Sequence, residues 1–289
     1  MTPDALWLAF PLLGIVAGVM AGLLGIGGGI VLVAALVALL PLLDVPSQAV
    51  MHVALATSLA SIIVTAAASA NAHRKRGSVL WPTAWSLAPG LLLGGLVGAR
   101  WAVRMPGETL ALIVGVFCLL MAARMAWPGT GADSPASAAS TTPAPRGAWL
   151  SGVGVVIGAV SAVVGIGGGS LTVPLLVSRG VATVRAVGTS SACGVVIGIA
   201  SAAAYALGAP DAAPAAADAA AGSTASVATP AMPAGIVGFV HLPAAIGIGI
   251  GAVIAAPWGV RLAHRISGRA LARVFAVGLA AVGVALLWP

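Results

Sequence analysis

Charged side chains are scarce in this sequence. Only 7% of its 289 residues are Asp, Glu, Lys or Arg, whereas 60% are hydrophobic and the mean hydropathy is +1.13. About a quarter of the residues of a typical soluble domain are charged, so the composition excludes that class. Apolar runs of at least about 18 residues recur along the chain, and runs of this length predict membrane-spanning helices. We therefore predict an all-α, polytopic membrane protein.

Carboxylates and cysteines are also few, and each shortage argues against a type of chemistry. All six Asp and Glu lie at the ends of apolar blocks or in loops, which argues against a carboxylate proton relay across the membrane. Cys118 and Cys193 lie apart in apolar segments and indicate neither a disulfide framework nor a metal site. We expect no catalytic residues, no metal and no cofactor, so the protein is not predicted to be an enzyme. A membrane redox subunit would need paired histidines, and four histidines lack that spacing: His52, His73, His241 and His264.

The basic residues indicate membrane orientation. The net charge is +7, but the 13 Lys and Arg are spread over short loops between apolar blocks. Loops of this kind orient a membrane protein, so we do not predict nucleic-acid binding. We predict a multi-pass protein of the cell inner membrane, in contact with the lipid bilayer. The oligomeric state stays open, with a homodimer among the alternatives.

The chain contains a duplicated unit. Its eight apolar blocks lie at about 5–43, 48–70, 79–103, 107–127, 148–178, 184–208, 235–260 and 267–288. Gly25 to Gly29 recur as Gly165 to Gly169, at an offset of 140 residues, and Thr57-Ser58 recur as Thr189-Ser190 at an offset of 132. Internal repeats of this kind are common in transporters. The predicted units are a first transmembrane repeat at 1–127, a flexible loop at 128–147, and a second repeat at 148–289 with a polar loop at 209–233.

The positions of the cations predict that the second repeat is inverted. If each glycine-broken block enters and leaves on one side, each repeat makes an odd number of crossings. Only Arg100 and Arg104 then face outward, and eleven Lys and Arg are cytoplasmic: Arg74, Lys75, Arg76, Arg124, Arg146, Arg179, Arg185, Arg261, Arg265, Arg269 and Arg273. Eight simple crossings would place at most eight inside. The positive-inside rule therefore favours two inverted repeats.

The glycine runs predict a broken helix at the start of each repeat. Each glycine costs a helix about 1 kcal/mol relative to alanine. In a bilayer, the interrupted backbone must face protein or a water-filled cavity, where the first amides of the restarted helix attract an anion. The predicted substrate-binding backbone is that of Gly27, Gly28, Gly29, Ile30, Gly167, Gly168, Gly169 and Ser170. The alternative is that the glycines only allow close helix packing.

Hydroxyl side chains lie near both breaks in the sequence. We predict that four of them complete an oxyanion site: Thr57, Ser58, Thr189 and Ser190. The alternative is that each hydroxyl bonds the carbonyl one helical turn earlier. The second break is the more polar, because Ser161, Ser170 and Thr172 stand where the first half has Ala21, Ile30 and Leu32.

Several motifs together resemble a known family. They are Gly14 to Gly18 leading into Gly22 to Gly29, Ala56-Thr57-Ser58-Leu59, Gly98-Ala99-Arg100, and Gly165 to Gly169 followed by Val173-Pro174. In these motifs the sequence resembles the sulfite exporter TauE/SafE family of bacterial membrane proteins. The resemblance implies a permease that exports sulfite, sulfonates or a related small organic or inorganic sulfur oxyanion. We expect alternating access, with a passive anion channel as the alternative and a membrane redox subunit as the less favoured one.

Overall fold

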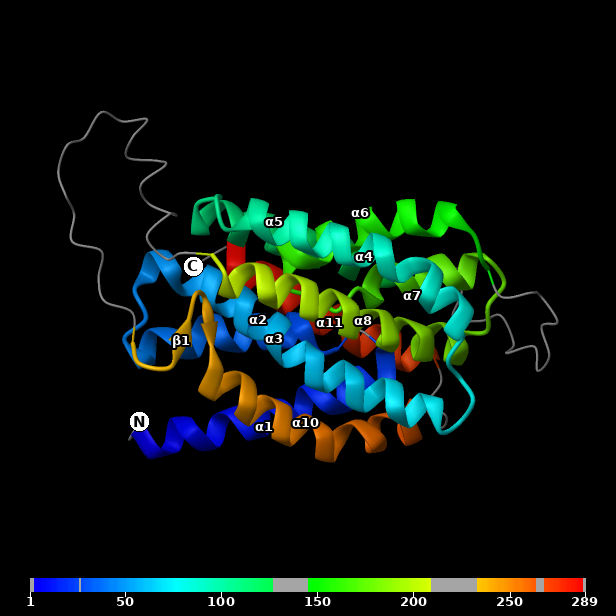
Figure 1. Cartoon of the computed structure of the whole chain (residues 1–289). Coiled ribbons are helices and arrows are strands. Elements are labelled where there is room, and N and C mark those ends of the chain that lie inside the picture. Colours follow the sequence, from blue (N-terminus) through cyan, green and yellow to red (C-terminus); the bar gives the residue numbers. More distant parts are fainter. Residues whose placement is uncertain (1–2, 26, 127–144, 209–232, 264–267, 288–289) are drawn as a thin grey trace.

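The described part of the chain is almost entirely helical. The computed structural model describes residues 3–25, 27–126, 145–208, 233–263 and 268–287 (Figure 1). These residues form ten α-helices, one 3-10 helix and one antiparallel hairpin: α1 (Pro3–Leu24), α2 (Gly29–Leu39), η1 (Leu40–Leu43), α3 (Ser47–Arg74), α4 (Trp81–Ala102), α5 (Gly107–Ala126), α6 (Ala148–Val164), α7 (Gly169–Ser178), α8 (Thr183–Ala206), β1 (Ile236–Val237), β2 (Val240–His241), α10 (Leu242–Ala263) and α11 (Gly268–Leu287). The all-α prediction is confirmed. The predicted loops 128–147 and 209–233 lie outside the described residues, except for 145–147 and 233.

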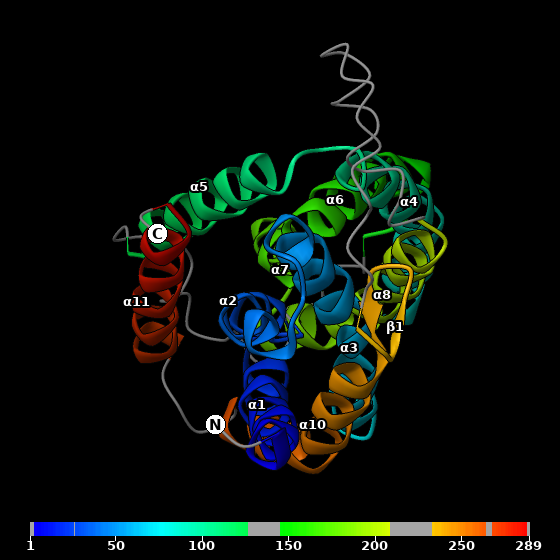
Figure 2. The ribbon, with the colours of Figure 1, turned by 90° about the vertical axis from the view of Figure 1, so that its left-hand side faces the viewer.

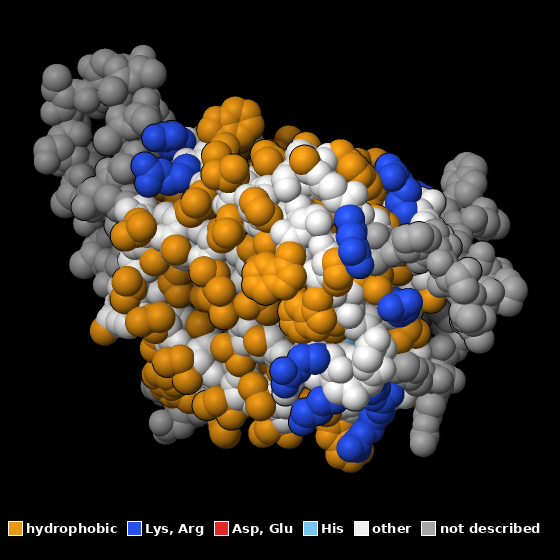
Figure 3. All heavy atoms as spheres, turned by 45° about the vertical axis from the view of Figure 1, so that its right-hand side comes forward, with side chains coloured by type: hydrophobic (Ala, Val, Ile, Leu, Met, Phe, Trp, Pro, Cys, Tyr) orange, Lys and Arg blue, Asp and Glu red, His pale blue; other side chains and the backbone are white. Residues whose placement is uncertain are grey.

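The surface of the helical bundle is apolar where it would meet lipid. Within the described residues, five helices are long and apolar enough to cross a membrane: α1, α3, α5, α8 and α10. Trp85, Trp101 and Trp258 are each at least 64% exposed, which is the environment of lipid-facing side chains rather than of a soluble surface. Figure 3 shows hydrophobic side chains across the middle of one face, between two groups of Lys and Arg. The protein is therefore a multi-pass membrane protein.

The cations gather at the two ends of the helices. Arg179 lies over the Trp149 ring, 4.3 Å from its centroid, so the end of α7 and the start of α6 share one end of the bundle. The turn after α3 carries Arg74 to Arg76 at this same end, and the turn after α4 carries Arg104 at the other (Figure 1). This is the separation that the inverted topology predicts for these residues.

The two halves are packed in opposite directions. The hydroxyl oxygens of Ser69 and Ser191 are 2.9 Å apart, whereas Gly198, further along α8, lies against Leu59 and Ile63, earlier in α3. Hence α3 and α8 are antiparallel. Because these helices occupy the same position in the two halves of the chain, their antiparallel packing makes the halves inverted repeats.

Helices of each half pack against helices of the other half. Helix α1 of the first half packs along α10 of the second, and α6 of the second packs along α4 of the first. Gly18 faces the Ala252 backbone in one of these contacts, and Gly94 faces the Val155 backbone in the other. Small residues allow this close approach.

The glycine runs break the first and fifth apolar blocks, as the sequence predicts. Each break separates two helices, α1 from α2 and α6 from α7, and the second helix begins at Gly29 or Gly169. Viewed along the bundle, α2 and α7 lie in the interior, surrounded by the longer helices (Figure 2). The two restarted helices are therefore enclosed by protein.

One predicted apolar block contains a β-hairpin as well as a helix. The block expected at 235–260 begins with the hairpin of β1 and β2, in which Ile236 pairs with His241 and Val237 with Val240. Gly235 and Gly238 have φ values of 92° and 58°, which end regular helix geometry before α10 starts at Leu242. The apolar block predicted at about 235–260 is therefore not helical before Leu242.

Candidate functional site

Left-handed backbone geometry fixes the two breaks in the chain. Gly28 precedes α2 with φ 70°, and Gly168 precedes α7 with φ 75°. Side-chain-bearing residues rarely adopt this geometry. A Cβ at Gly28 would also lie 2.7 Å from the Ala17 carbonyl oxygen, and one at Gly168 would collide with Ile197. The sequence therefore requires glycine at both points where the helices restart.

The two breaks meet inside the bundle. The Ser58 Oγ of α3 lies 3.1 Å from the Gly29 carbonyl oxygen and 3.1 Å from that of Gly165. One hydroxyl proton is shared between these two acceptors. A Cβ at Gly29 would collide with the Gly165 carbonyl oxygen, so the two breaks are in direct contact.

The first backbone amides of both restarted helices have no acceptor within their own helix. In α7, the amides of Leu171 and Thr172 donate to the Gly168 carbonyl at 3.2 and 2.8 Å. The amides of Gly169 and Ser170 precede these bonds and point out of the helix start, where the helix dipole is positive. The amides of Gly29 and Ile30 hold the same position in α2. The geometry expected of these donors is present, and their binding of substrate stays a prediction.

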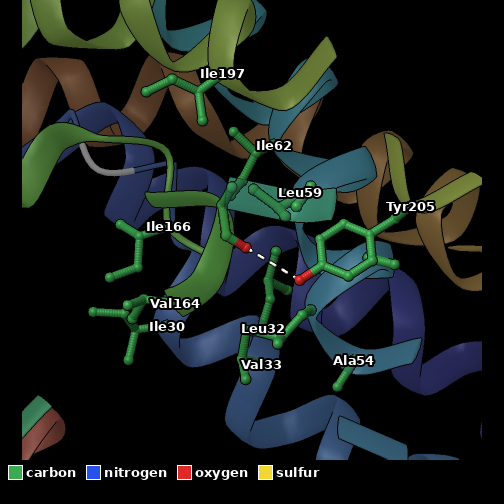
Figure 4. Packing of buried hydrophobic residues seen from close by; sticks show 14 of the residues in the cluster. Ile30, Leu32, Val33, Ala54, Leu59, Ile62, Val164, Ile166, Ile197 and Tyr205 are labelled. Carbon is green, nitrogen blue, oxygen red and sulfur yellow. Dashed lines mark hydrogen bonds between the residues drawn. The ribbon is translucent and has the colours of Figure 1, made fainter. Parts of the chain in front are cut away.

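The carbonyls at the breaks, by contrast, already have donors. Ser190 Oγ donates to the Gly25 carbonyl at 2.9 Å, and Thr65 Oγ1 donates to that of Gly27 at 3.0 Å. Tyr205 Oη donates to the Ala162 carbonyl at 3.3 Å, the bond that is dashed in Figure 4. Ser58 and Ser190 therefore use their protons on the backbone. Because these carbonyl acceptors are already paired, the breaks are rich in N–H donors.

The predicted threonines hold the two segments that lead into α4 and α10. Thr57 Oγ1 accepts the His241 amide at 3.0 Å, and Thr189 Oγ1 accepts the Leu80 amide at 2.9 Å. Thr189 also donates to the Arg185 carbonyl at 2.7 Å, which is the bond that the alternative reading expected. The structure thus places these hydroxyls against chain segments at opposite ends of the bundle, and a role in binding substrate stays a prediction for both.

Three hydroxyls near the second break have no partner. Within the described residues, the buried oxygens of Ser161, Ser170 and Thr172 make no hydrogen bond. The Ser161 and Thr172 side chains are 2% and 0% exposed, and the Ser161 oxygen lies 3.6 Å from the position of a Cβ on Gly168. The sequence showed that this region is polar, but the predicted site included Ser170 and omitted Ser161 and Thr172.

No fixed charge balances this polar region. Among the side chains that the structure places, those of Asp, Glu, Lys and Arg are exposed, and no cluster of three or more His, Cys, Asp or Glu forms a metal site. Figure 4 shows that apolar side chains, including those of Ile30, Ile62 and Ile197, pack close to the breaks. Neutral donors in an apolar interior interact strongly with an oxyanion, because little water screens them.

The chain is similar in sequence to known proteins over most of its length. The family model described as "Sulfite exporter TauE/SafE" matches residues 10–286. A "Probable membrane transporter protein" of Haemophilus influenzae is 32% identical over 275 residues, which cover 94% of this chain and 95% of the relative. A "Probable membrane transporter protein YunE" of Bacillus subtilis is 32% identical over 39% of each chain. No solved structure gives a significant match.

Proposed function

Because the chain belongs to the sulfite exporter TauE/SafE family and is a membrane transporter, we propose that it exports a small sulfur-containing oxyanion across the cell inner membrane by alternating access. The contact between the two glycine breaks supports this proposal most strongly. In transporters with inverted repeats, the substrate binds near the midplane, where interrupted helices direct their positive ends toward an anion. Here the starts of α2 and α7 meet in the interior of such a pair of repeats.

Closed segments at both ends of the bundle support a carrier rather than an open pore. At one end, the side chains of Phe10, Phe239 and His241 are buried, with exposed fractions of 5% or less. At the other end, Ser78 and Leu80 are buried before α4. Alternating access requires a closed region on each side of the substrate, and each of these regions contains one of the threonine bonds.

The membrane potential supports export. The end with most of the cations faces the cytoplasm under the positive-inside rule. A cytoplasm that is negative by 100 mV drives each negative charge outward with about 2.3 kcal/mol. Export of an anion down this gradient needs no coupling ion.

Efflux from proteoliposomes tests the function. Vesicles containing the purified protein are loaded in turn with sulfite, thiosulfate, an alkyl sulfonate and sulfate, and efflux is followed by isotope release. We expect the protein to accelerate the efflux of at least one sulfur oxyanion, with a rate that saturates with concentration. Efflux equal to that of protein-free vesicles for all four anions would contradict the proposal, and a rate that never saturates would favour a channel.

A further inference from the structure

The two glycine breaks are equivalent in backbone geometry but differ in chemistry. The first is surrounded by apolar side chains at the positions where the second carries hydroxyls. Ala21 corresponds to Ser161 and Leu32 to Thr172, and all four side chains are buried. The first break also has its Gly27 carbonyl paired by Thr65, whereas the residue equivalent to Thr65 in the second half is Ile197. The first break therefore has the same leading amides as the second, but it lacks the two hydroxyls, and its Gly27 carbonyl is already paired.

Ser161 and Thr172 are exceptions among the buried hydroxyls of this chain. Ser61 and Ser191, for example, donate to the carbonyl one turn earlier, at 2.8 and 3.0 Å. The corresponding carbonyl for Thr172 is that of Gly168, which already accepts the amides of Leu171 and Thr172. Both lone pairs of that oxygen are thus occupied. A buried hydroxyl without a partner is unfavourable, so two of them beside one glycine break indicate a missing acceptor.

The two hydroxyls are placed beside the same glycine. The Thr172 amide donates to the Gly168 carbonyl at 2.8 Å, so Thr172 lies one helical turn after Gly168, and the Ser161 oxygen lies 3.6 Å from the Cβ position of Gly168. Ser170 is two residues from Thr172 and therefore points to a different side of α7. Ser161 and Thr172 are consequently the pair that can act together with the amides of Gly169 and Ser170.

We propose that the transported oxyanion binds at the second break alone, with Ser161 and Thr172 as donors beside the first amides of α7, while the first break has a structural role. This inference rests on the proposed function and assigns its binding site to one repeat. At the second break, the Gly165 carbonyl already accepts the Ser58 proton, and the Gly168 carbonyl accepts the amides of Leu171 and Thr172. The site therefore offers donors, and it suits an acceptor-only anion with several oxygens on one centre, such as a sulfonate or the fully deprotonated sulfite ion.

Binding to purified protein tests the assignment. The thermal unfolding midpoint in detergent is measured against increasing sodium sulfite and sodium methanesulfonate, with sodium chloride at equal ionic strength as the reference. Ser161→Ala and Thr172→Val each remove one hydroxyl, and we expect each to raise the anion concentration for half of the maximal shift by about tenfold or more. Thr172→Ser keeps the hydroxyl and should stay within about threefold of the wild type. Ser86→Ala is the matched control, because the Ser86 hydroxyl donates to the Pro82 carbonyl on the exposed side of α4.

The outcomes separate this assignment from the proposed function. Suppose that the wild type transports a sulfur oxyanion, but that both hydroxyl-deleting variants need the same anion concentration as the wild type for half of the maximal shift. The assignment is then wrong and the transport function stands. If Thr172→Ser is impaired as strongly as Thr172→Val, the methyl packing matters rather than the hydroxyl, and the assignment again fails. If the wild type neither binds nor transports any of the anions, both proposals fall.

Discussion

The Ser58 hydroxyl lies 3.1 Å from the Gly165 carbonyl oxygen, and this contact ties α3 of the first repeat to the glycine break of the second. Its symmetry equivalent is the Ser190 hydroxyl, which donates to the Gly25 carbonyl at 2.9 Å. Each repeat thus supports the break of the other. The unbroken helices α3 and α8 provide these hydroxyls, so they hold both restarted helices in place.

Removing either of these hydroxyls should destabilise the protein. Ser58→Ala leaves two buried carbonyls without their side-chain donor, and Ser190→Ala leaves one, so we expect losses of about 1–3 kcal/mol for each, larger for Ser58. The unfolding midpoint in detergent measures the loss. Ser86→Ala serves as the reference, because the hydroxyl of Ser86 makes an exposed hydrogen bond. Equal midpoints for all three variants would show that the contacts across the repeats do not stabilise the fold.

A side chain at Gly168 should abolish transport. Gly168→Val places a β-branched residue at φ 75° and against Ile197, so the start of α7 must shift. We expect transport below a tenth of the wild-type rate, with the protein still present in the membrane. Gly152→Ala is the control, because Gly152 has no atom within 4 Å of its Cβ position. Normal efflux by Gly168→Val in vesicles would contradict a role for the break geometry.

The threonine bonds predict two separate closed regions. Thr57→Val removes the acceptor for the His241 amide, and Thr189→Val removes that for the Leu80 amide. We expect each change to open one end of the bundle. Cysteines substituted at Val240 and Leu80, which are 3% and 6% exposed, report this opening by their reaction with a membrane-impermeant maleimide.

The expected labelling pattern is specific to each end. Thr57→Val should increase labelling of Val240→Cys several-fold and leave Leu80→Cys unchanged, and Thr189→Val should do the reverse. Cys118 and Cys193 are buried, which keeps the background low. If either threonine change increased labelling at both ends equally, the two regions would not act as separate gates.

His241 should make the closed segment before α10 sensitive to acid. Burial lowers the pKa of His241 from its ordinary value of 6.5, and its Nδ1 accepts the Ala244 amide at 3.1 Å, which requires an unprotonated nitrogen. The stabilising contribution is therefore fully present above about pH 6.5 and is lost as the pH falls through the lowered pKa. His241→Asn keeps an acceptor for this amide but does not titrate. We expect the wild type to lose more thermal stability than this variant between pH 7.5 and about pH 5. Parallel curves of the unfolding midpoint against pH would exclude His241 as the source of the acid sensitivity.

The sequence predicted the architecture well because membrane folds have strong constraints. Long apolar runs, repeated glycine motifs and the distribution of cations each have few physical solutions in a bilayer. They led to the broken helices at Gly25 to Gly29 and Gly165 to Gly169, and to the inverted packing that α3 and α8 display. The hairpin before α10 was missed, because its apolar residues match a helix in hydropathy and only the glycines at 235 and 238 mark the turns.

The binding residues were less predictable than the fold. Thr57, Ser58, Thr189 and Ser190 are buried hydroxyls near the repeated motifs, but the direction of their bonds depends on tertiary neighbours that no local pattern encodes. Their partners lie 29 to 184 residues away, with the exception of the Arg185 carbonyl. Comparison of the two halves was the informative signal, since it showed hydroxyls at 161 and 172 where the first half is apolar. The absence of a partner for these hydroxyls became visible only in the folded chain.

Exchange across proteoliposome membranes tests the central claim most directly. Isotopic sulfite, or whichever sulfur oxyanion is transported, is trapped inside, and its release is measured with and without the same unlabelled anion outside. A carrier that alternates around the two glycine breaks predicts a saturable release that external anion accelerates, and Gly168→Val should abolish this release. Release that the external anion does not accelerate, or that persists in Gly168→Val, would contradict the account.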